Sequence, residues 1–129
     1  MMTMSSLATI VRDTLGLPPE TAVRPDQLLF YDLAFTSLDF LDLLYRVEEQ
    51  FAIAIPEGTL ARLARGELDE AGFSFKEYLT PIGRTRLMAL LFDSPAEIFP
   101  EKIHVQTLPR YCTVAAIARL VDHKLAEKT

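Results

Sequence analysis

The chain has 129 residues, a hydrophobic content of 50% and a formal net charge of -5. This length suffices for one domain with its own apolar core, and no apolar run is long enough to cross a bilayer. The acidic balance argues against a nucleic-acid partner, because phosphate binding relies on clustered lysine and arginine. We therefore expect a single domain over residues 1–129. We also expect a cytoplasmic location, because the first residues lack the features of a secretory signal.

Cysteine and histidine are scarce in the chain. Cys112 is the only cysteine, so no internal disulfide can form. His104 and His123 are too few and too far apart in sequence to indicate a metal site. The sequence therefore predicts no metal centre and a Cys112 side chain that packs as a small apolar group.

A first helix is predicted to begin with Ser5 or Ser6 as its N-cap and to end at Gly16. Its apolar residues recur at helical spacing: Leu7, Ile10, Val11 and Leu15. The long connection that follows contains three prolines but is too apolar for a free linker. The residues expected to hold it against the helices are Leu28, Leu29, Phe30, Leu33 and Phe35.

The second helix is predicted to begin with Thr36 as its N-cap and Asp39 at its third position, which is a variant of the capping box. Ser37 is then the first helical residue, and its hydroxyl is free to face water. Phe35 before the cap and Phe40 within the first turns are placed to form a hydrophobic staple.

This helix should end near Phe51, because Pro56 favours extended backbone before it. Apolar residues at helical spacing predict one buried face: Leu38, Leu41, Leu43, Leu44, Val47 and Phe51. Polar residues three or four positions apart predict a face that meets a partner: Asp39, Asp42, Arg46, Glu49 and Gln50.

A brief third helix is expected around Leu60, Leu63 and Ala64, closed by Gly66. The aromatic and aliphatic residues after it should dock on the core: Phe73, Phe75, Tyr78 and Leu79. A further helix should run from a cap at Thr80 to about Phe92.

The pattern from Ser94 to Glu97 resembles another capping box and predicts a turn of helix before Pro100. The last helix is predicted to begin after Thr113 as its N-cap. Its inward residues should be Val114, Ile117, Ala118, Val121 and Leu125.

The second helix and its flanks resemble the acyl carrier protein family. Thr36-Ser37-Leu38 is similar to the D-S-L motif that opens the second helix in that family. The resemblance extends through Ser37 to Leu43, Val47 to Phe51 and Ile53 to Pro56, which look like S-L-D-x-V-E-L, L-E-E-x-F and I-x-I-P. Thr113-Val114 is also similar to the opening of the last helix of the family.

This resemblance implies an all-α fold, namely a four-helix bundle with an additional helical insertion between helices three and four. Residues 57–112 would contain the third helix and the insertion. The family usually has the third helix but not the insertion. Three positions depart from the family pattern: Thr36 replaces the usual acid, Ala34 stands where glycine is common, and Arg46 interrupts the acidic stripe.

The resemblance also implies a carrier without catalytic residues, which holds acyl groups as thioesters on a 4'-phosphopantetheine arm attached to Ser37. A phosphopantetheinyl transferase would attach the arm. Acyl-loading and acyl-processing enzymes of fatty-acid, lipid or polyketide-type synthesis would be its partners, and we expect a monomer. The matching partner-binding residues are Leu38, Asp39, Asp42, Tyr45 and Glu49. The matching lining for an acyl chain is Leu43, Val47, Phe51 and Ile55.

Two other classes of function compete with this interpretation. One is a helical interaction module of the same fold that is never modified at Ser37. The other is an enzyme that uses Ser37 or Cys112 with His104 or His123 as base, although no spacing indicates a nucleophile elbow or an oxyanion loop. For the insertion itself two interpretations stay open: it specialises cargo or partner binding, or it only stabilises the fold.

Overall fold

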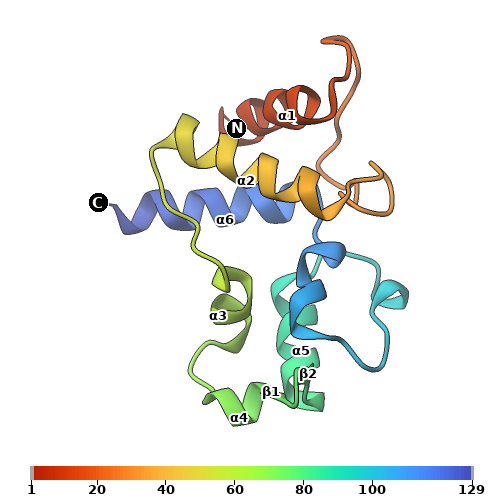
Figure 1. Cartoon of the computed structure of the whole chain (residues 1–129), viewed down its shortest axis with the longest axis vertical. Helices are drawn as coiled ribbons and strands as arrows, with labels where there is room; N and C mark the ends of the chain where they lie inside the picture. The colour runs from red at the N-terminus through yellow and green to blue at the C-terminus, as the bar shows by residue number, and fades with distance from the viewer. Residues whose placement is uncertain (1, 129) are drawn as a thin grey trace.

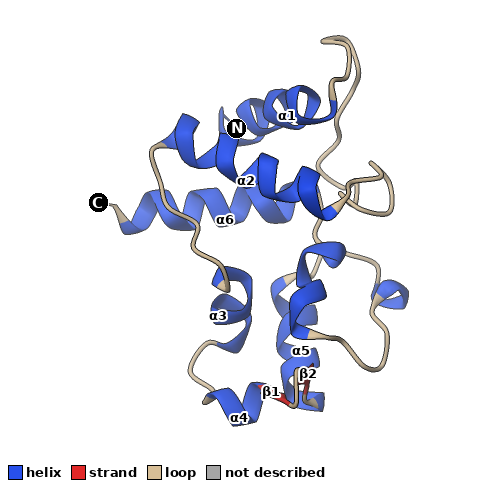
Figure 2. Cartoon of the chain, in the orientation of Figure 1, coloured by secondary structure: helices blue, strands red, loops and turns tan. Residues whose placement is uncertain are grey.

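The computed structural model describes residues 2–128, which are mostly helical (Figures 1 and 2). The α-helices of this range are α1 (Met2–Leu15), α2 (Ser37–Phe51), α3 (Thr59–Arg65), α4 (Glu70–Phe73), α5 (Pro81–Leu90) and α6 (Val114–Glu127). The 3-10 helices are η1 (Ala96–Ile98) and η2 (Val105–Tyr111), and the strands are β1 (Ser74–Phe75) and β2 (Tyr78–Leu79). The predicted helical class is confirmed, with the additional elements between α3 and α6.

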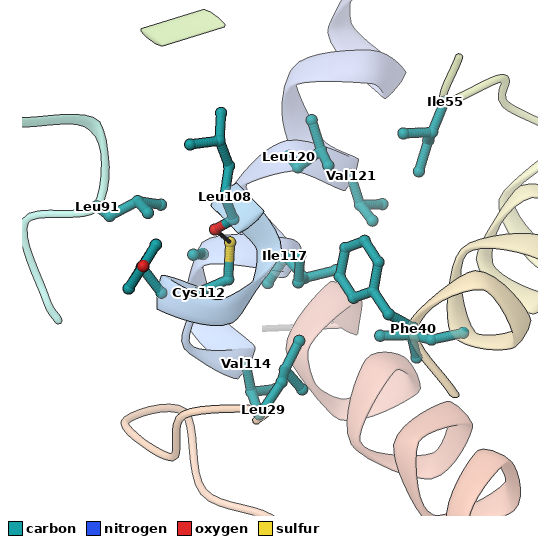
Figure 3. Packing of buried hydrophobic residues seen from close by; sticks show 14 of the residues in the cluster. Leu29, Phe40, Ile55, Leu91, Leu108, Cys112, Val114, Ile117, Leu120 and Val121 are labelled. Atoms are coloured by element: carbon teal, nitrogen blue, oxygen red, sulfur yellow. Dashed lines mark hydrogen bonds between the residues drawn. The ribbon is translucent and has the colours of Figure 1, made fainter. Parts of the chain in front are cut away.

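Helices α1, α2 and α6 pack together and enclose one part of the core (Figure 1). Their contributions are fully buried leucine, valine and isoleucine side chains: Leu7 and Val11 from α1, Leu43 and Val47 from α2, and Ile117 and Val121 from α6. Figure 3 shows the Phe40 ring directed from α2 toward the α6 residues Ile117 and Val121. The helix that carries Ser37 is therefore packed firmly along its inner side.

Helix α3 packs mainly against α5, and the insertion forms a second part of the molecule next to the first (Figure 1). Its buried side chains include Phe73, Leu87, Leu91 and Leu108, and they belong to the same apolar cluster as the bundle. The insertion thus shares a continuous core with the bundle.

Helix α1 begins at Met2, so the prediction that Ser5 or Ser6 caps it is wrong. Tertiary contacts explain the earlier start. Thr3 Oγ1 donates a hydrogen bond to Asp122 Oδ1 of α6 at 2.8 Å, and Met4 packs against the core. The predicted end is confirmed, because Gly16 follows the helix with a φ of 68°.

Helix α2 begins and ends where the sequence predicts. Its end is made by Ala52, which adopts a left-handed φ of 54° and donates its N–H to the carbonyl oxygen of Glu48. Pro56 lies further along the chain, so the left-handed residue rather than the proline terminates the helix.

The prediction of which α2 residues are buried is only partly correct. Phe40, Leu43 and Val47 are buried, but Leu38 is 77% exposed and Leu41 is 61% exposed. Each exposed leucine precedes a buried residue by two positions, which is a rotation of about 200° around a helix of 3.6 residues per turn. Two nearly opposite stripes therefore share the same spacing, and only packing selects the buried one.

A short antiparallel hairpin follows α4 and was not predicted. Lys76 and Glu77 form its turn with φ values of 50° and 72°. Phe73 and Leu79 are buried as expected, but Phe75 and Tyr78 are exposed, so their predicted docking on the core is wrong. The pleat explains this outcome, because neighbouring residues of a strand point to opposite faces.

Two of the three remaining predicted caps are confirmed. Thr80 caps α5 through a hydrogen bond from the Gly83 N–H, and Thr113 caps α6 through one from the Ala116 N–H. The third is wrong, because η1 receives no side-chain cap from Ser94. The Ser94 hydroxyl is buried and instead donates to the Tyr111 carbonyl oxygen at 2.5 Å.

Asp93 joins the insertion to the start of α6. Its carboxylate accepts hydrogen bonds from Thr113 Oγ1 at 2.9 Å and from both terminal nitrogens of Arg119 at 3.0 Å. The Arg119 guanidinium also stacks on the Phe92 ring, with 4.4 Å to the centroid. Partial burial alone would raise the pKa of Asp93, but the bonds from Arg119 and Thr113 outweigh it and lower that pKa.

We predict that Asp93→Asn lowers the free energy of unfolding by about 1–2 kcal/mol at neutral pH, since a charged hydrogen-bond acceptor is lost. A carboxyl with a lowered folded pKa contributes stability above its ordinary pKa of 3.8, and this contribution disappears as pH falls through the lower folded value. Urea unfolding at pH 7 and at about pH 3 should therefore show a difference between variant and parent that shrinks in acid. The control is Asp26→Asn, which removes an exposed ion pair with Arg24. An equal effect at both pH values would contradict the assignment.

Candidate functional site at the start of the second helix

Ser37 is the first residue of α2, and its side chain is exposed. Within residues 2–128 its hydroxyl makes no hydrogen bond. The neighbouring capping box explains why it is free. Thr36 Oγ1 accepts from the Asp39 N–H at 3.1 Å, and Asp39 Oδ2 accepts from the Thr36 N–H at 2.9 Å. Thr36 and Asp39 thus cap the start of the helix through each other's backbone N–H groups. The Ser37 hydroxyl is not needed for the cap and faces solvent.

The loop before Ser37 is fixed to the core by aromatic rings. The Phe30 ring lies 6.3 Å from the Phe35 ring and 6.1 Å from the Phe40 ring, so it joins the two predicted staple residues. Ala34 adopts a left-handed φ of 57°, which explains why glycine suits this position. Ser37 is therefore presented by a packed loop rather than by a free one.

The same loop completes the start of α6. The Val114 N–H donates to the Gln27 carbonyl oxygen at 2.9 Å, and the Ala115 N–H donates to the Pro25 carbonyl oxygen at 3.0 Å. A backbone bridge also joins Leu28 to Thr113. The loop thus satisfies backbone groups that the first turn of a helix leaves unpaired, and the two helix starts are held together.

The first turn of α2 presents unpaired backbone donors. The first intrahelical bond runs from the Phe40 N–H to the Thr36 carbonyl oxygen, at 3.1 Å. Among the described residues, the N–H groups of Ser37 and Leu38 have no acceptor. Such donors and the positive end of the helix dipole favour an anionic group such as a phosphodiester at this position.

The predicted partner-binding residues lie along α2 beyond Ser37. Leu38 and Tyr45 are exposed, and Glu49 is exposed near the other end of the helix. Asp42 accepts from Arg46 Nε at 3.1 Å, four residues further along the helix. The Tyr45 hydroxyl is hydrogen-bonded to Glu49, and this bond to a carboxylate raises the pKa of Tyr45.

The predicted acyl-chain lining belongs to the core. Leu43, Val47 and Ile55 are buried, and Phe51 is partly buried. Two hollows of the described chain lie elsewhere. One of about 320 Å³ lies between α3, α5 and α6, and one of about 400 Å³ lies beside α3, α4 and β1. The four lining residues contribute to neither hollow, so their role stays a prediction.

The alternative nucleophile Cys112 and the candidate bases His104 and His123 make their contacts with residues other than Ser37. The Cys112 thiol is buried, and burial raises its pKa to about 12. His104 packs edge-on against Tyr78, and His123 lies 3.3 Å from a Glu127 oxygen. Within residues 2–128, no group of histidine, cysteine and acidic side chains is arranged to hold a metal ion.

We predict that Cys112 resists alkylation in the native protein at pH 8, because both burial and the raised pKa suppress the reactive thiolate. Iodoacetamide should add to the thiol only after unfolding in about 6 M guanidinium chloride, a concentration above the unfolding midpoint of most domains. The intact mass of the chain after iodoacetamide treatment, measured for the native and for the unfolded protein, shows whether the thiol was alkylated in each state. Rapid labelling of the native chain would contradict this placement of the thiol.

Comparison with known proteins identifies the family. Residues 5–65 match the family model described as a phosphopantetheine attachment site. The chain is 32% identical over 76 residues to an acyl carrier protein, AcpXL, of Rhizobium meliloti (strain 1021); the match covers 59% of this chain and 75% of the relative. The chain belongs to the acyl carrier protein family. The prosthetic group expected of this family member is 4'-phosphopantetheine.

A second relative is the AcpXL acyl carrier protein of Mesorhizobium japonicum (strain LMG 29417 / CECT 9101 / MAFF 303099). It is 33% identical over 54 residues, which cover 42% of this chain and 57% of the relative. The family model spans α1, the loop, α2 and α3, and most of the insertion lies beyond it. Among the described helices of the chain, none has the length and apolar character needed to span a bilayer.

Proposed function

We propose that Ser37 carries the 4'-phosphopantetheine arm and that the protein holds acyl groups as thioesters on it. In the attachment step the Ser37 oxygen would form a bond to the pantetheine phosphate of coenzyme A. The bond from that phosphate to the nucleotide part would break, and the hydroxyl proton would pass to the transferase. When bound, the arm supplies the thiol that forms the thioester.

One observation carries this proposal. The Ser37 hydroxyl is exposed and without a hydrogen bond, and it stands beside the unpaired N–H groups of Ser37 and Leu38. The residues fit the group, because a serine oxygen can take the phosphate while these backbone donors and the helix dipole stabilise its charge. Thr36 and Asp39 keep this geometry through their capping box.

The partners in this proposal are a phosphopantetheinyl transferase and the enzymes that load and process the acyl group in fatty-acid, lipid or polyketide-type synthesis. The surface beyond Ser37, with Leu38, Asp39, Asp42, Tyr45 and Glu49, supports docking of such enzymes. A carrier that visits several enzymes needs brief contacts, and an acidic helix speeds encounter more than it strengthens the complex.

The test is the intact mass of the purified chain after exposure to coenzyme A and a broad-specificity phosphopantetheinyl transferase. The proposal expects a gain of one arm per chain, and peptide mapping should place it on the peptide that contains Ser37. A chain that gains no mass, or that gains it on another peptide, would overturn the assignment.

A further inference from the structure

The hollow of about 400 Å³ beside α3, α4 and β1 belongs to the part of the molecule that contains the insertion (Figure 1). None of the residues that line it comes from α2. Pockets that bind small molecules usually have volumes of about 300–1,000 Å³. The hollow is therefore large enough for a small ligand, and its lining shows which chemistry that ligand would need.

Arg65 lines this hollow with a guanidinium group whose donors are unused. Its Nε atom is buried and has no hydrogen-bond partner within residues 2–128. Its Nη1 atom forms an ion pair with Glu70 Oε1 at 3.5 Å, and the guanidinium donates no hydrogen bond in the described part of the chain. Nearly all buried N–H groups in proteins have an acceptor. The Nε donor of Arg65 therefore points to an acceptor that the chain itself does not supply.

Further donors lie around Arg65. Arg62 also lines the hollow, and its Nη2 atom donates to Thr59 Oγ1 at 3.3 Å, which holds it beside α3. Arg86 reaches the end of the same helix, where its Nη1 atom donates to the Arg65 carbonyl oxygen at 3.5 Å. Ser74 contributes a hydroxyl that makes no hydrogen bond among the described residues. Three cationic side chains and one hydroxyl thus gather at the hollow.

The charge at the hollow is positive, although the whole chain has a formal net charge of -5. Glu70 is the only carboxylate among the described lining residues, and its side chain is 91% exposed. The negative end of the α3 dipole also favours Arg62 and Arg65 in the last turn of that helix. The dipole acts on the charge of a side chain, however, and gives the buried Nε donor no acceptor. An anion with several oxygen acceptors would meet both needs.

The remaining lining is largely apolar. Ala61, Phe73 and Val105 contribute to it, and Phe73 is buried. Such a wall suits a ligand that joins its anionic group to a short apolar stem. A guanidinium binds phosphate through two parallel hydrogen bonds. A phosphate monoester can carry two negative charges and so compensates both Arg62 and Arg65, whereas a carboxylate carries only one.

We propose that Arg62, Arg65 and Ser74 bind a phosphate monoester with a short apolar substituent in this hollow. The site goes beyond the proposed function and uses no residue of α2. The same phosphate chemistry occurs in soluble phosphate esters and in the headgroup of phosphatidic acid, so the experiment separates these two sources.

The experiment titrates the purified chain with hexyl phosphate and with inorganic phosphate, and isothermal titration calorimetry measures the dissociation constants. In parallel, nuclear magnetic resonance of the nitrogen-15-labelled chain follows the Nε–Hε signal of Arg65. The variants are Arg65→Gln, Arg62→Gln and Ser74→Ala. Arg24→Gln is the matched control, because it removes the same charge from a side chain that is 64% exposed in the loop between α1 and α2.

Arg65→Gln should weaken hexyl phosphate binding by about tenfold or more, since several hydrogen bonds to a charged group are lost. Arg62→Gln should weaken it by roughly fivefold and Ser74→Ala by roughly threefold. Arg24→Gln should change it by less than about twofold, because exposed charges are screened by salt. The Arg65 Nε–Hε signal should shift on binding. Inorganic phosphate should bind several times more weakly, since it lacks the stem that the apolar wall would cover.

The source of the phosphate is tested by sedimentation with phosphatidylcholine vesicles that contain or lack phosphatidic acid. Binding that requires phosphatidic acid and is lost in Arg65→Gln would assign a lipid headgroup. Binding of hexyl phosphate without sedimentation would assign a soluble ester. Either result supports the phosphate site.

Three results would overturn the site: no saturable binding of hexyl phosphate up to about 10 mM, an Arg65 Nε–Hε signal that does not move, or an effect of Arg24→Gln equal to that of Arg65→Gln. Urea unfolding checks that each variant folds. If Arg65→Gln does not fold, the exposed position of Arg62 decides the test, and an unchanged affinity in Arg62→Gln would then overturn the site. Attachment of the arm to Ser37 is measured separately and is expected to be the same in all these variants.

Discussion

Replacing Ser37 with alanine should abolish attachment of the phosphopantetheine arm completely. The reason is chemical, because the side-chain oxygen is the atom that would bond to the phosphate, and alanine has none. The fold should be unaffected. The Ser37 hydroxyl makes no hydrogen bond in the described chain, and the cap of α2 is made by Thr36 and Asp39. The expected change in the free energy of unfolding is within about 0.5 kcal/mol.

The measurement is intact mass after incubation with coenzyme A and the transferase, together with urea unfolding of the variant. Ser5→Ala is the matched control, since Ser5 is also an exposed serine within a helix, far from α2 in sequence. The control should gain one arm as the parent does. A mass gain that persists in Ser37→Ala would show that another residue is modified. A chain that binds partners unchanged without ever gaining mass would favour the unmodified interaction module.

Replacing Gly83 with alanine should lower the free energy of unfolding by about 3 kcal/mol, at the upper end of the usual cost of overpacking. A Cβ at this position would lie 2.0 Å from the Phe73 carbonyl oxygen. That oxygen cannot move easily, because it accepts from the Thr80 N–H at 2.9 Å and from Thr80 Oγ1 at 3.1 Å. The substitution should therefore separate α4 from the start of α5.

Urea unfolding with far-ultraviolet circular dichroism measures this effect. Thr85→Ala is the control, because Thr85 is exposed on the same helix and its truncation should cost about 0.5 kcal/mol or less. The Gly83 variant should still take the arm on Ser37 if it folds, since Gly83 lies on α5 and Ser37 lies on α2, in the other part of the molecule (Figure 1). A stability equal to that of the parent would mean that Phe73 and Gly83 are not in close contact.

Local patterns in the sequence predicted the start of α2 correctly. Thr36 and Asp39 form their capping box from residues three apart, so no distant contact is needed to specify it. The caps at Thr80 and Thr113 were predicted for the same reason. Short-range hydrogen bonds of this kind depend on residue type and spacing alone, which a sequence displays directly.

The hairpin after α4 gave no comparable signal. A two-residue turn with two positive φ values usually contains asparagine, aspartate or glycine, but Lys76 and Glu77 occupy this one. Backbone bonds from other segments hold it instead. The Leu79 N–H donates to the Ile103 carbonyl oxygen at 2.9 Å, and the Val105 N–H donates to the Glu77 carbonyl oxygen at 2.9 Å. Long-range pairing thus overrode the local preference of the turn residues.

The sequence by itself determined the helical class, the start of α2 and the position of Ser37 as its first residue, because helix caps are local and apolar spacing reports the helical period. Only the tertiary structure decided which of two nearly opposite apolar stripes of α2 is buried. Packing of α1 and α6 covers Phe40 and Leu43 and leaves Leu41 exposed. The spacing of residues fixes a helix but not the direction from which its neighbours approach.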